Sequence, residues 1–365
     1  MSLENRSNSK GEMMAINTRS HLKNLYRTPM ESKKRRKFLR LDMNENPDGL
    51  PNDFIQNILS EIEGDYLSSY PEYYQLTQKL AEYNQLAFEN ICLSNGSDAA
   101  IKYIFDCFIS PKDKILLTEP TFAMYPVYCK MFDAHNLSVS YNDDFSFPTE
   151  TFINNITSDI RLAVLVNPNN PTGSFISPND MGRIIQKAYE ENVLLIIDEA
   201  YFYFYDYTAI DKIKWFDNLI VLRTFSKLCG LAALRLGYIA ADSTIITNVN
   251  RVKPTFDVNG IAVFVATKLL ENKNIIKKQI DALQEGKNYI IDRLTESGID
   301  FRSGNANFVL INCKGQIDNI IQSLEKQKIL VSGKFKQSFL KDYIRVTIAG
   351  KKKMEYFWNV FEVIL

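Results

Sequence analysis

Five short apolar runs, each followed by polar residues, limit most strongly how this chain can fold. Continuous apolar runs that alternate with segments of helical periodicity are typical of strands buried on both faces of a parallel sheet. We therefore predict an α/β fold whose main domain is a mostly parallel sheet flanked by helices. The runs are Ile91–Leu93, Ile115–Leu117, Leu162–Val166, Val193–Ile197 and Leu219–Leu222.

The residues that follow these runs indicate where a ligand binds. In an open α/β sheet, the ligand site lies outside the carboxyl ends of the strands. The sequence therefore predicts that a set of polar and reactive side chains gathers along one edge of the sheet. This set consists of Asn95, Ser97, Asn167, Asn170, Asp198, Ser226 and Lys227.

The chain changes character near residue 270, which indicates a second, smaller α/β domain. A long helical stretch from Asn272 to Ser297 is followed by shorter elements. These are strands at 307–311, 329–331 and 343–348, a helix at 317–326 and a last helix from Lys351. We predict a large ligand-binding domain over residues 62–270, and a small domain built from residues 37–61 and 271–365.

Residues 1–36 are polar and rich in Lys and Arg, and we expect them to form a flexible N-terminal arm. The basic run Ser32–Lys37 could be a targeting signal or a phosphate-binding patch. It has no aromatic residues interleaved, which favours a simple solvated stretch.

Composition argues against several classes of function. The chain has 43 Lys and Arg against 43 Asp and Glu, so its charge does not indicate a nucleic-acid partner. Its two histidines, His21 and His135, make a His-rich metal site and a Ser-His-Asp triad implausible. No apolar run reaches the length of a membrane span, and the five scattered cysteines are typical of free thiols. We therefore expect a soluble cytoplasmic protein without a metal ion.

Taken one at a time, the polar motifs have ordinary structural explanations. Asp198 alone is a strand-end acid, and Asn167–Gly173 alone is a turn, because Pro fixes φ while Asn and Gly tolerate unusual φ. Gly96–Asp98 opens a helix, where Ser or Asp is a common N-cap, although such a helix start also binds phosphate. Ser226 and Arg235 could add a hydroxyl and a guanidinium to the same anion.

Lys227 indicates one ligand that would account for all of these motifs. A partly desolvated lysine with cationic neighbours has a lowered pKa and attacks aldehydes. An acid, an amide and a phosphate cup would share its edge of the sheet, and Tyr125 would either pack in the core or stack on a flat ring. Pyridoxal 5'-phosphate suits this set, because its aldehyde forms a Schiff base with Lys and its ring nitrogen pairs with Asp.

Together, the motifs resemble the fold type I pyridoxal-phosphate enzymes of the class I and II aminotransferases, and most of all the histidinol-phosphate aminotransferase branch. The resemblance runs from Leu41–Pro47 to Ile344–Ile348, and its most specific parts are Asn167–Gly173, Asp198–Tyr201 and Thr224–Tyr238. It implies a homodimeric enzyme that moves an amino group from an amino acid or a histidinol-phosphate-like amine to a 2-oxo acid such as 2-oxoglutarate.

The resemblance also implies catalytic roles for three residues. Lys227 would hold the cofactor through a Schiff base and move the substrate's Cα proton. Asp198 would pair with the protonated ring nitrogen, and Tyr201 would hydrogen-bond the ring 3-oxygen together with Asn170. Tyr125 would stack on the ring.

Further residues are implied in binding the phosphate and the substrate. The cofactor phosphate would be held by Gly96, Ser97, Asp98, Thr224, Ser226 and Arg235, and by Tyr70 of the neighbouring subunit. Arg345 would anchor the substrate's carboxylate or phosphate, with Asn170 beside it. The branch usually carries a second Arg where this chain has Ser332, and Lys334 is the candidate substitute, although a point charge does not replace a bidentate fork.

Two alternative functions share the same core residues. A phosphothreonine decarboxylase would also need Lys227 and Asp198, but those relatives tend to carry a further Arg where this chain has Ala349 and Gly350. A non-catalytic sensor that binds the cofactor is the second alternative. The N-terminal arm contains no recognisable helix-turn-helix sequence, which disfavours a regulator of that kind.

Overall fold

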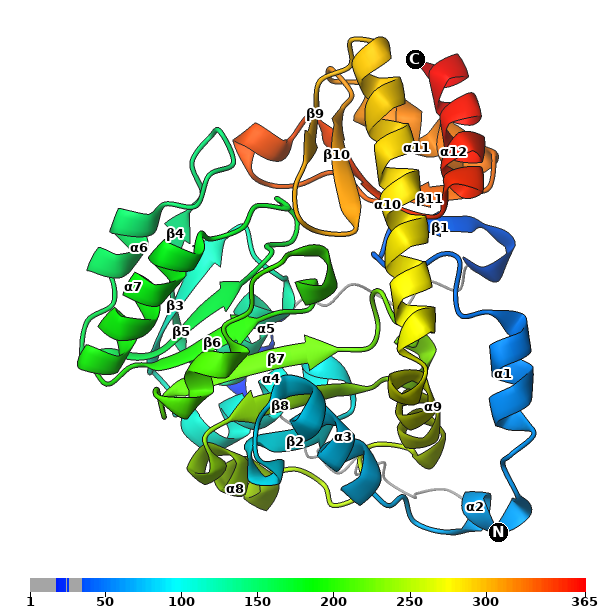
Figure 1. Cartoon of the computed structure of the whole chain (residues 1–365). Coiled ribbons are helices and arrows are strands. Elements are labelled where there is room, and N and C mark those ends of the chain that lie inside the picture. The colour runs from blue at the N-terminus through cyan, green and yellow to red at the C-terminus, as the bar shows by residue number, and fades with distance from the viewer. Residues whose placement is uncertain (1–17, 24, 26–34) are drawn as a thin grey trace, which may run out of the picture.

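A mixed β-sheet forms the centre of the large part of the molecule in the computed structural model, which describes residues 18–23, 25 and 35–365 (Figure 1). Among these residues the sheet has seven strands, in the spatial order β2-β8-β7-β6-β5-β3-β4. Only β8 is antiparallel to its neighbours, which confirms the predicted mostly parallel sheet. The bounds are β2 Ile91–Ser94, β3 Lys114–Glu119, β4 His135–Ser140, β5 Ile160–Val166, β6 Leu194–Asp198, β7 Leu219–Thr224 and β8 Gly237–Ala241.

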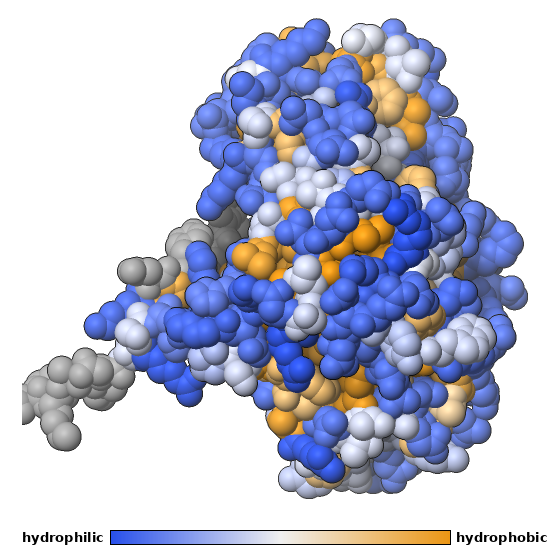
Figure 2. Space-filling view, turned by 90° about the vertical axis from the view of Figure 1, so that its left-hand side faces the viewer, coloured by the Kyte–Doolittle hydropathy of each residue, from blue (hydrophilic) through white to orange (hydrophobic). Residues whose placement is uncertain are grey.

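All five predicted strands are present, and sequence analysis missed two others. Strand β4 lies at the edge of the sheet, where five of its six residues are exposed, so it lacks an apolar run. Figure 2 looks toward this side of the molecule, and its surface is largely hydrophilic. Strand β8 is buried throughout, but its short Gly-Tyr-Ile-Ala-Ala sequence begins inside the segment Thr224–Tyr238, which was interpreted as a binding motif.

Alternating side chains divide the core around the sheet into two layers. Ile196 and Leu222 contribute to one apolar cluster, and their neighbours Ile197 and Val221 contribute to the other. The first cluster includes α4, α5 and α8, and the second includes α3, α6, α7 and α9. Burial on both faces explains why the strands are continuous apolar runs in the sequence. The bounds are α3 Tyr74–Asn84, α4 Gly96–Phe108, α5 Met124–Met131, α6 Thr149–Asn154, α7 Pro178–Glu190, α8 Ser243–Val252 and α9 Gly260–Glu271.

The smaller α/β part lies at the top of Figure 1 and combines elements from both ends of the chain. Strand β10 pairs antiparallel with β9 and β12, while β1 pairs parallel with β11. The predicted boundaries at 62–270, 37–61 and 271–365 stay a prediction. The bounds of its elements are β1 Leu39–Leu41, α10 Lys273–Glu296, β9 Phe301–Ser303, β10 Phe308–Asn312, α11 Ile317–Lys326, β11 Ile329–Val331, β12 Tyr343–Thr347 and α12 Lys351–Ile364. Between β1 and the large part, α1 Asn52–Leu59 and α2 Gly64–Ser68 run down the right side of Figure 1.

The predicted N-terminal arm, residues 1–36, lies mostly outside the described residues, as does half of the basic run Ser32–Lys37. Arg35 is described, and it is not a freely solvated side chain. Its guanidinium forms ion pairs with Asp42 and Glu45, both at 2.6 Å, and is one-quarter exposed. Within the described ranges, no helix is long and apolar enough to cross a membrane.

Candidate active site

A pocket opens at the carboxyl ends of the central strands, as sequence analysis predicts. It holds about 550 Å³ of space, including its open mouth. Five of the seven expected side chains line it, whereas Asn95 is exposed and Asn167 accepts a hydrogen bond from the N–H of Ile176 at 2.9 Å. The lining residues are Ser97, Asp98, Phe122, Val166, Asn170, Asp198, Ala200, Tyr201, Thr224, Ser226, Lys227 and Arg235.

Lys227 lies in the turn that follows β7 and is half-buried. Its Nζ donates a hydrogen bond to the backbone carbonyl of Met43 at 3.0 Å and lies 5.7 Å from the ring centre of Tyr201. Burial, followed by the positive charge of Arg345, lowers the pKa of Lys227 to about 8. A lysine with this pKa carries a useful fraction of neutral amine near pH 7, so it is a nucleophile toward carbonyl groups.

Asp198 is the last residue of β6 and is almost completely buried. Burial raises the pKa of its carboxyl to about 6. The hydroxyl of Tyr125, at 2.9 Å, and the N–H of Ala200, at 3.1 Å, donate hydrogen bonds to the carboxylate and limit the rise. The carboxylate is therefore ionised at neutral pH but poorly solvated, and it favours a cationic partner.

The N-terminus of α4 and the turn after β7 form an anion site in the pocket. The N–H groups in the first turn of a helix attract negative charge, and Ser97 lies in this turn. Arg235 donates to the hydroxyl of Ser226 at 3.4 Å, and Thr224 donates to the same hydroxyl at 3.0 Å. Gly96 has a φ of +77°, and a Cβ there would lie 2.7 Å from Arg235 Nη2, so glycine leaves room for the guanidinium.

A buried arginine on the side of the small part contacts the pocket lining without being one of the lining residues. Arg345, on β12, donates hydrogen bonds to the side-chain oxygen of Asn170 and, at 2.6 Å, to the backbone carbonyl of Asp42. Its Nε is buried and has no hydrogen-bond partner among the residues that are described. Because Asn170 lines the pocket, this contact links the loop after β5 to the small part and brings a fixed positive charge toward the ligand space.

Tyr201 makes a polar contact that sequence analysis missed. Its hydroxyl is buried and accepts a hydrogen bond from the side-chain amide of Asn44 at 2.8 Å. Asn44 is also buried, has a φ of 57°, and accepts a hydrogen bond from the hydroxyl of Thr347 at 3.1 Å. The available signal was the polar segment Leu41–Pro47, in which an Asn occupies a left-handed position that this residue type tolerates.

Tyr125 and Asp98 both use their side chains for contacts within the protein. Tyr125 is fully buried and its hydroxyl is turned to Asp198, so its ring does not lie on the pocket wall. Phe122, three residues earlier, lines the pocket instead. The side chain of Asp98 accepts a hydrogen bond from the hydroxyl of Tyr128 at 3.1 Å, which leaves its backbone N–H as the group suited to an anion.

Two predicted residues lie away from the pocket within this single chain. Lys334 is largely exposed and forms an ion pair with Asp318 on α11, because the loop after β11 runs past that helix. Tyr70 is 75% exposed, and its ring stacks on Phe256 with 4.3 Å between the ring centres. Neither side chain contributes to the pocket lining among the described residues.

Comparison with known sequences decides the family. Residues 36–359 match the family described as Aminotransferase class I and II. The chain belongs to this family. The aminotransferase is 35% identical over 330 residues to the histidinol-phosphate aminotransferase of Thermoanaerobacter sp. strain X514, and the match covers 89% of this chain and 93% of that protein.

Solved structures share the fold of the aminotransferase. Histidinol-phosphate aminotransferase from Sinorhizobium meliloti, in complex with pyridoxal-5'-phosphate, matches with a TM-score of 0.86 and 22% identity, over 97% of this chain and 98% of that one. L-threonine-O-3-phosphate decarboxylase from Porphyromonas gingivalis matches with a TM-score of 0.76 and 22% identity, over 89% and 98%. At these identities the two structures support the predicted fold type I architecture alone.

Aminotransferases of this family depend on pyridoxal 5'-phosphate, and the pocket suits that cofactor. The space that Gly96 leaves beside Arg235 adjoins two hydroxyls and a helix N-terminus, which suits a phosphate group. The poorly solvated carboxylate of Asp198 suits a protonated ring nitrogen, and Lys227 suits an aldehyde. The predicted cofactor is thus confirmed by the family and fits the geometry.

Proposed function

We propose that this aminotransferase moves the amino group of an amino acid, or of an amino-alcohol phosphate similar to histidinol phosphate, to a 2-oxo acid such as 2-oxoglutarate. The observation that carries the proposal is the placement of Lys227 and Asp198 on one pocket, between the anion site beside Arg235 and the buried guanidinium of Arg345. One pocket thus offers a nucleophilic amine, an acid for a ring cation, and positive charge for two separate anionic groups.

Lys227 acts twice in this proposal. Its neutral amine would bind the aldehyde of the cofactor, and once released from it, Nζ would remove the substrate's Cα proton as a general base. The lowered pKa of Lys227, about 8, supports both roles because the neutral form is accessible near pH 7. When it is bound, pyridoxal phosphate supplies an electron-withdrawing ring, and Asp198 keeps the ring nitrogen protonated.

The remaining lining residues orient the cofactor. Ser226, Thr224 and Arg235 would hold the phosphate, together with the backbone N–H groups of Ser97 and Asp98, next to Gly96. Tyr201 and Asn170 would hydrogen-bond the ring 3-oxygen. Phe122, in place of Tyr125, would stack on the ring, because its side chain lies on the pocket wall.

Arg345 anchors the anionic group of the substrate. Its guanidinium is preorganised by the carbonyl of Asp42 and by Asn170, so it meets an incoming carboxylate or phosphate in a fixed orientation. Lys334 has no part in this proposal, because it pairs with Asp318 outside the pocket.

We also propose a homodimer in the cytoplasm. Tyr70 lies in an exposed apolar region with Phe256, and a second copy packed on this region would cover both rings and bring Tyr70 to the partner's cofactor phosphate. The five cysteines are all free, which supports a reducing compartment.

A single-turnover panel tests the proposed activity. The cofactor-loaded enzyme is mixed in turn with individual amino acids and with histidinol phosphate, and the visible absorbance of the lysine-bound cofactor is followed. An amine that is a substrate bleaches this absorbance and yields its carbonyl product, and a 2-oxo acid then restores the absorbance.

Three outcomes would contradict the proposal. Release of carbon dioxide with the absorbance retained would indicate a decarboxylase. Binding of the cofactor without turnover of any amine would indicate a sensor. A Lys227→Ala variant that keeps the visible absorbance would remove the lysine from its assigned role.

A further inference from the structure

A buried ion pair lies behind the pocket, and each of its members is next in the chain to a residue that lines the pocket. Glu199 follows Asp198 at the end of β6, and Arg223 precedes Thr224 at the end of β7. Nη2 and Nε of Arg223 donate to one carboxylate oxygen of Glu199 at 2.8 and 3.0 Å, and the two side chains are only 3% and 2% exposed.

Strand alternation explains why this pair faces away from the ligand. Asp198 continues the face of Ile196, which packs against α4 and α5, whereas Glu199 continues the opposite face with Ile197. By the same alternation Thr224 lies on the pocket side and Arg223 does not. The pair therefore joins the end of β6 to the end of β7 on the face of the sheet opposite to the pocket. Asp198 is the last residue of β6, and Lys227 lies in the turn after β7.

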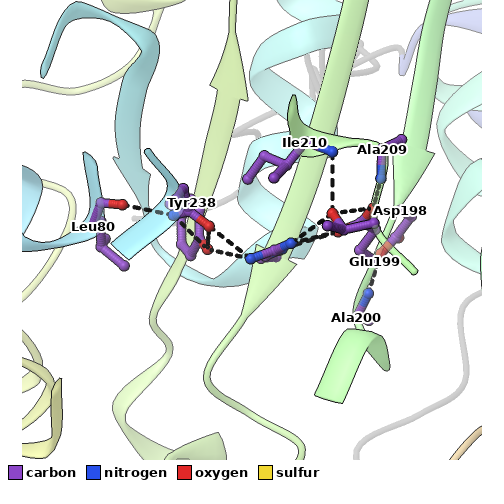
Figure 3. A network of polar contacts seen from close by, with 10 residues as sticks. Leu80, Asp198, Glu199, Ala200, Ala209, Ile210 and Tyr238 are labelled. Atoms are coloured by element: carbon purple, nitrogen blue, oxygen red, sulfur yellow. Dashed lines mark hydrogen bonds and ion pairs between the residues drawn. The ribbon is translucent and has the colours of Figure 1, made fainter. Parts of the chain in front are cut away.

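The surrounding groups satisfy the hydrogen-bonding capacity of the pair (Figure 3). Glu199 accepts from the hydroxyl of Thr208 at 2.8 Å and from the N–H of Ala209 at 2.7 Å. Arg223 donates to the side-chain oxygen of Asn84 at 2.7 Å and to the hydroxyl of Tyr238 at 3.4 Å. The network thus joins β6, β7 and β8 to the end of α3.

The pair acts at the point where the backbone ladder between β6 and β7 stops. The last paired residues are Asp198 and Leu222, followed by one hydrogen bond from the N–H of Glu199 to the carbonyl of Leu222 at 2.9 Å. The paired part of β6 and β7 ends at this bond, next to the pocket. The Glu199–Arg223 pair is therefore the link that fixes their separation where Asp198 and Lys227 diverge.

Stability alone does not account for such a pair. Removing two charges from water costs several kcal/mol, and well-packed apolar side chains in place of a buried ion pair are often neutral or stabilising. A guanidinium that donates through two nitrogens to one carboxylate oxygen differs from apolar packing in its fixed direction and distance.

We propose that Glu199 and Arg223 are positioning residues that set the separation of Asp198 and Lys227. They thereby determine where the acid and the amine lie relative to the cofactor ring. The proposal rests on the roles given to Asp198 and Lys227 in the proposed function. Neither positioning residue touches the ligand.

A double substitution distinguishes an effect on the positions of Asp198 and Lys227 from an effect on protein stability. The single variant Arg223→Met leaves Glu199 charged and unpaired in the core, and it should lose thermal stability. The double variant Arg223→Met/Glu199→Leu removes both charges and should recover a thermal midpoint close to that of the wild type. If the pair positions the site, the double variant should still lose turnover, by about tenfold or more.

A second readout uses the cofactor-free protein. The rate at which the lysine takes up cofactor should follow the neutral fraction of Lys227 and so have its pH midpoint at about 8 in the wild type. In the double variant, looser strand ends let water reach Lys227, so the midpoint should move upward toward the ordinary value by about one pH unit.

A matched control removes a second arginine–glutamate ion pair, which does not belong to this network. Arg183 on α7 donates to Glu150 on α6 at 2.7 and 2.9 Å, at the outer surface. The variant Arg183→Gln/Glu150→Gln should leave the midpoint and the turnover unchanged.

A double variant that recovers stability and also keeps the wild-type midpoint and turnover would overturn the proposal and leave the pair as structural. If the double variant does not fold, Arg223→Lys carries the test, because it keeps the positive charge beside Glu199 but loses the directed contact made by two guanidinium nitrogens. It should show the same upward shift, and no shift would overturn the proposal. Failure of the proposed function would be seen separately, as loss of amine turnover in the wild type itself.

Discussion

At the scale of single residues, burial shifts the two central groups of the pocket in opposite senses. Desolvation disfavours the charged form of each, so the pKa of Asp198 rises to about 6 and that of Lys227 falls to about 8. Between these two values Asp198 is ionised and Lys227 gains its neutral form as pH rises. One site can therefore supply an ionised acid and a nucleophilic amine at the same pH.

The cofactor should therefore attach to the protein with a defined pH dependence. The neutral amine of Lys227 is the reacting form, so the attachment rate should rise as pH increases through about 8 and then level off. Stopped-flow absorbance of the cofactor-free protein mixed with pyridoxal 5'-phosphate measures this rate. A midpoint near the ordinary lysine value would contradict the assigned desolvation.

Replacing Asp198 with Asn should stabilise the cofactor-free protein while lowering turnover by about a hundredfold or more. The folded-state pKa of about 6 lies above the ordinary 3.8, so ionising Asp198 destabilises the folded protein progressively as pH rises from about 4 to about 6. The variant should gain on the order of 2 kcal/mol at pH about 7, and the gain should vanish below pH about 4. Thermal unfolding at the two pH values measures it, and a lower midpoint than wild type at neutral pH would contradict it.

At the scale of elements, the start of α4 has room for an anion because glycine occupies position 96. A Cβ at Gly96 would press on Arg235 Nη2, and its φ of +77° strains any other residue. Gly96→Ala should therefore displace the guanidinium and weaken cofactor binding by about tenfold. Fluorescence titration with the cofactor measures this affinity.

Gly64 supplies the control for that substitution. It begins α2, has an ordinary φ, and a Cβ there would meet nothing within 4 Å. Gly64→Ala should bind the cofactor as the wild type does. Equal affinity of Gly96→Ala and wild type would show that the phosphate is not held at the start of α4.

The strands show how far the sequence alone could predict the fold. The central strands were found because both of their faces are buried, which gives continuous apolar runs. Strand β4 was missed because an edge strand that faces water has no such run, and β8 because small residues in a presumed binding motif resemble a loop. Both strands were missed because their burial depends on the tertiary fold, which the local sequence pattern does not show.

Sequence analysis placed Lys227, Asp198 and Arg235 at one site, and all three line one pocket. The site was predicted less well where geometry decides. Tyr125 and Phe122 are three residues apart near the start of α5, and only their packing shows which ring faces the ligand. Asn44 likewise gains its contact with the pocket through folding, since it comes from a distant part of the chain.

At the scale of the whole molecule, the proposed dimer makes each site depend on two chains. Two inactive variants, Lys227→Ala and Tyr70→Ala, should complement one another when they are mixed and allowed to exchange subunits. Each mixed dimer would contain one intact site, with the lysine from one subunit and the tyrosine from the other. Since half of the dimers would be mixed, about a quarter of the wild-type activity should return.

A control mixture defines that result. Lys227→Ala mixed with Asp198→Asn should recover no activity, because both altered residues belong to the same chain's pocket. Sedimentation of the mixtures reports the assembly independently of activity. Absence of recovery in stable mixed dimers would place Tyr70 outside the neighbouring site.

The contact between Arg345 and Asn170 crosses from the small part of the molecule to the large sheet, and it does so beside the ligand space. Any anion that captures this guanidinium must compete with the amide that already holds it. We therefore expect a bound substrate anion to weaken this hydrogen bond between the two parts.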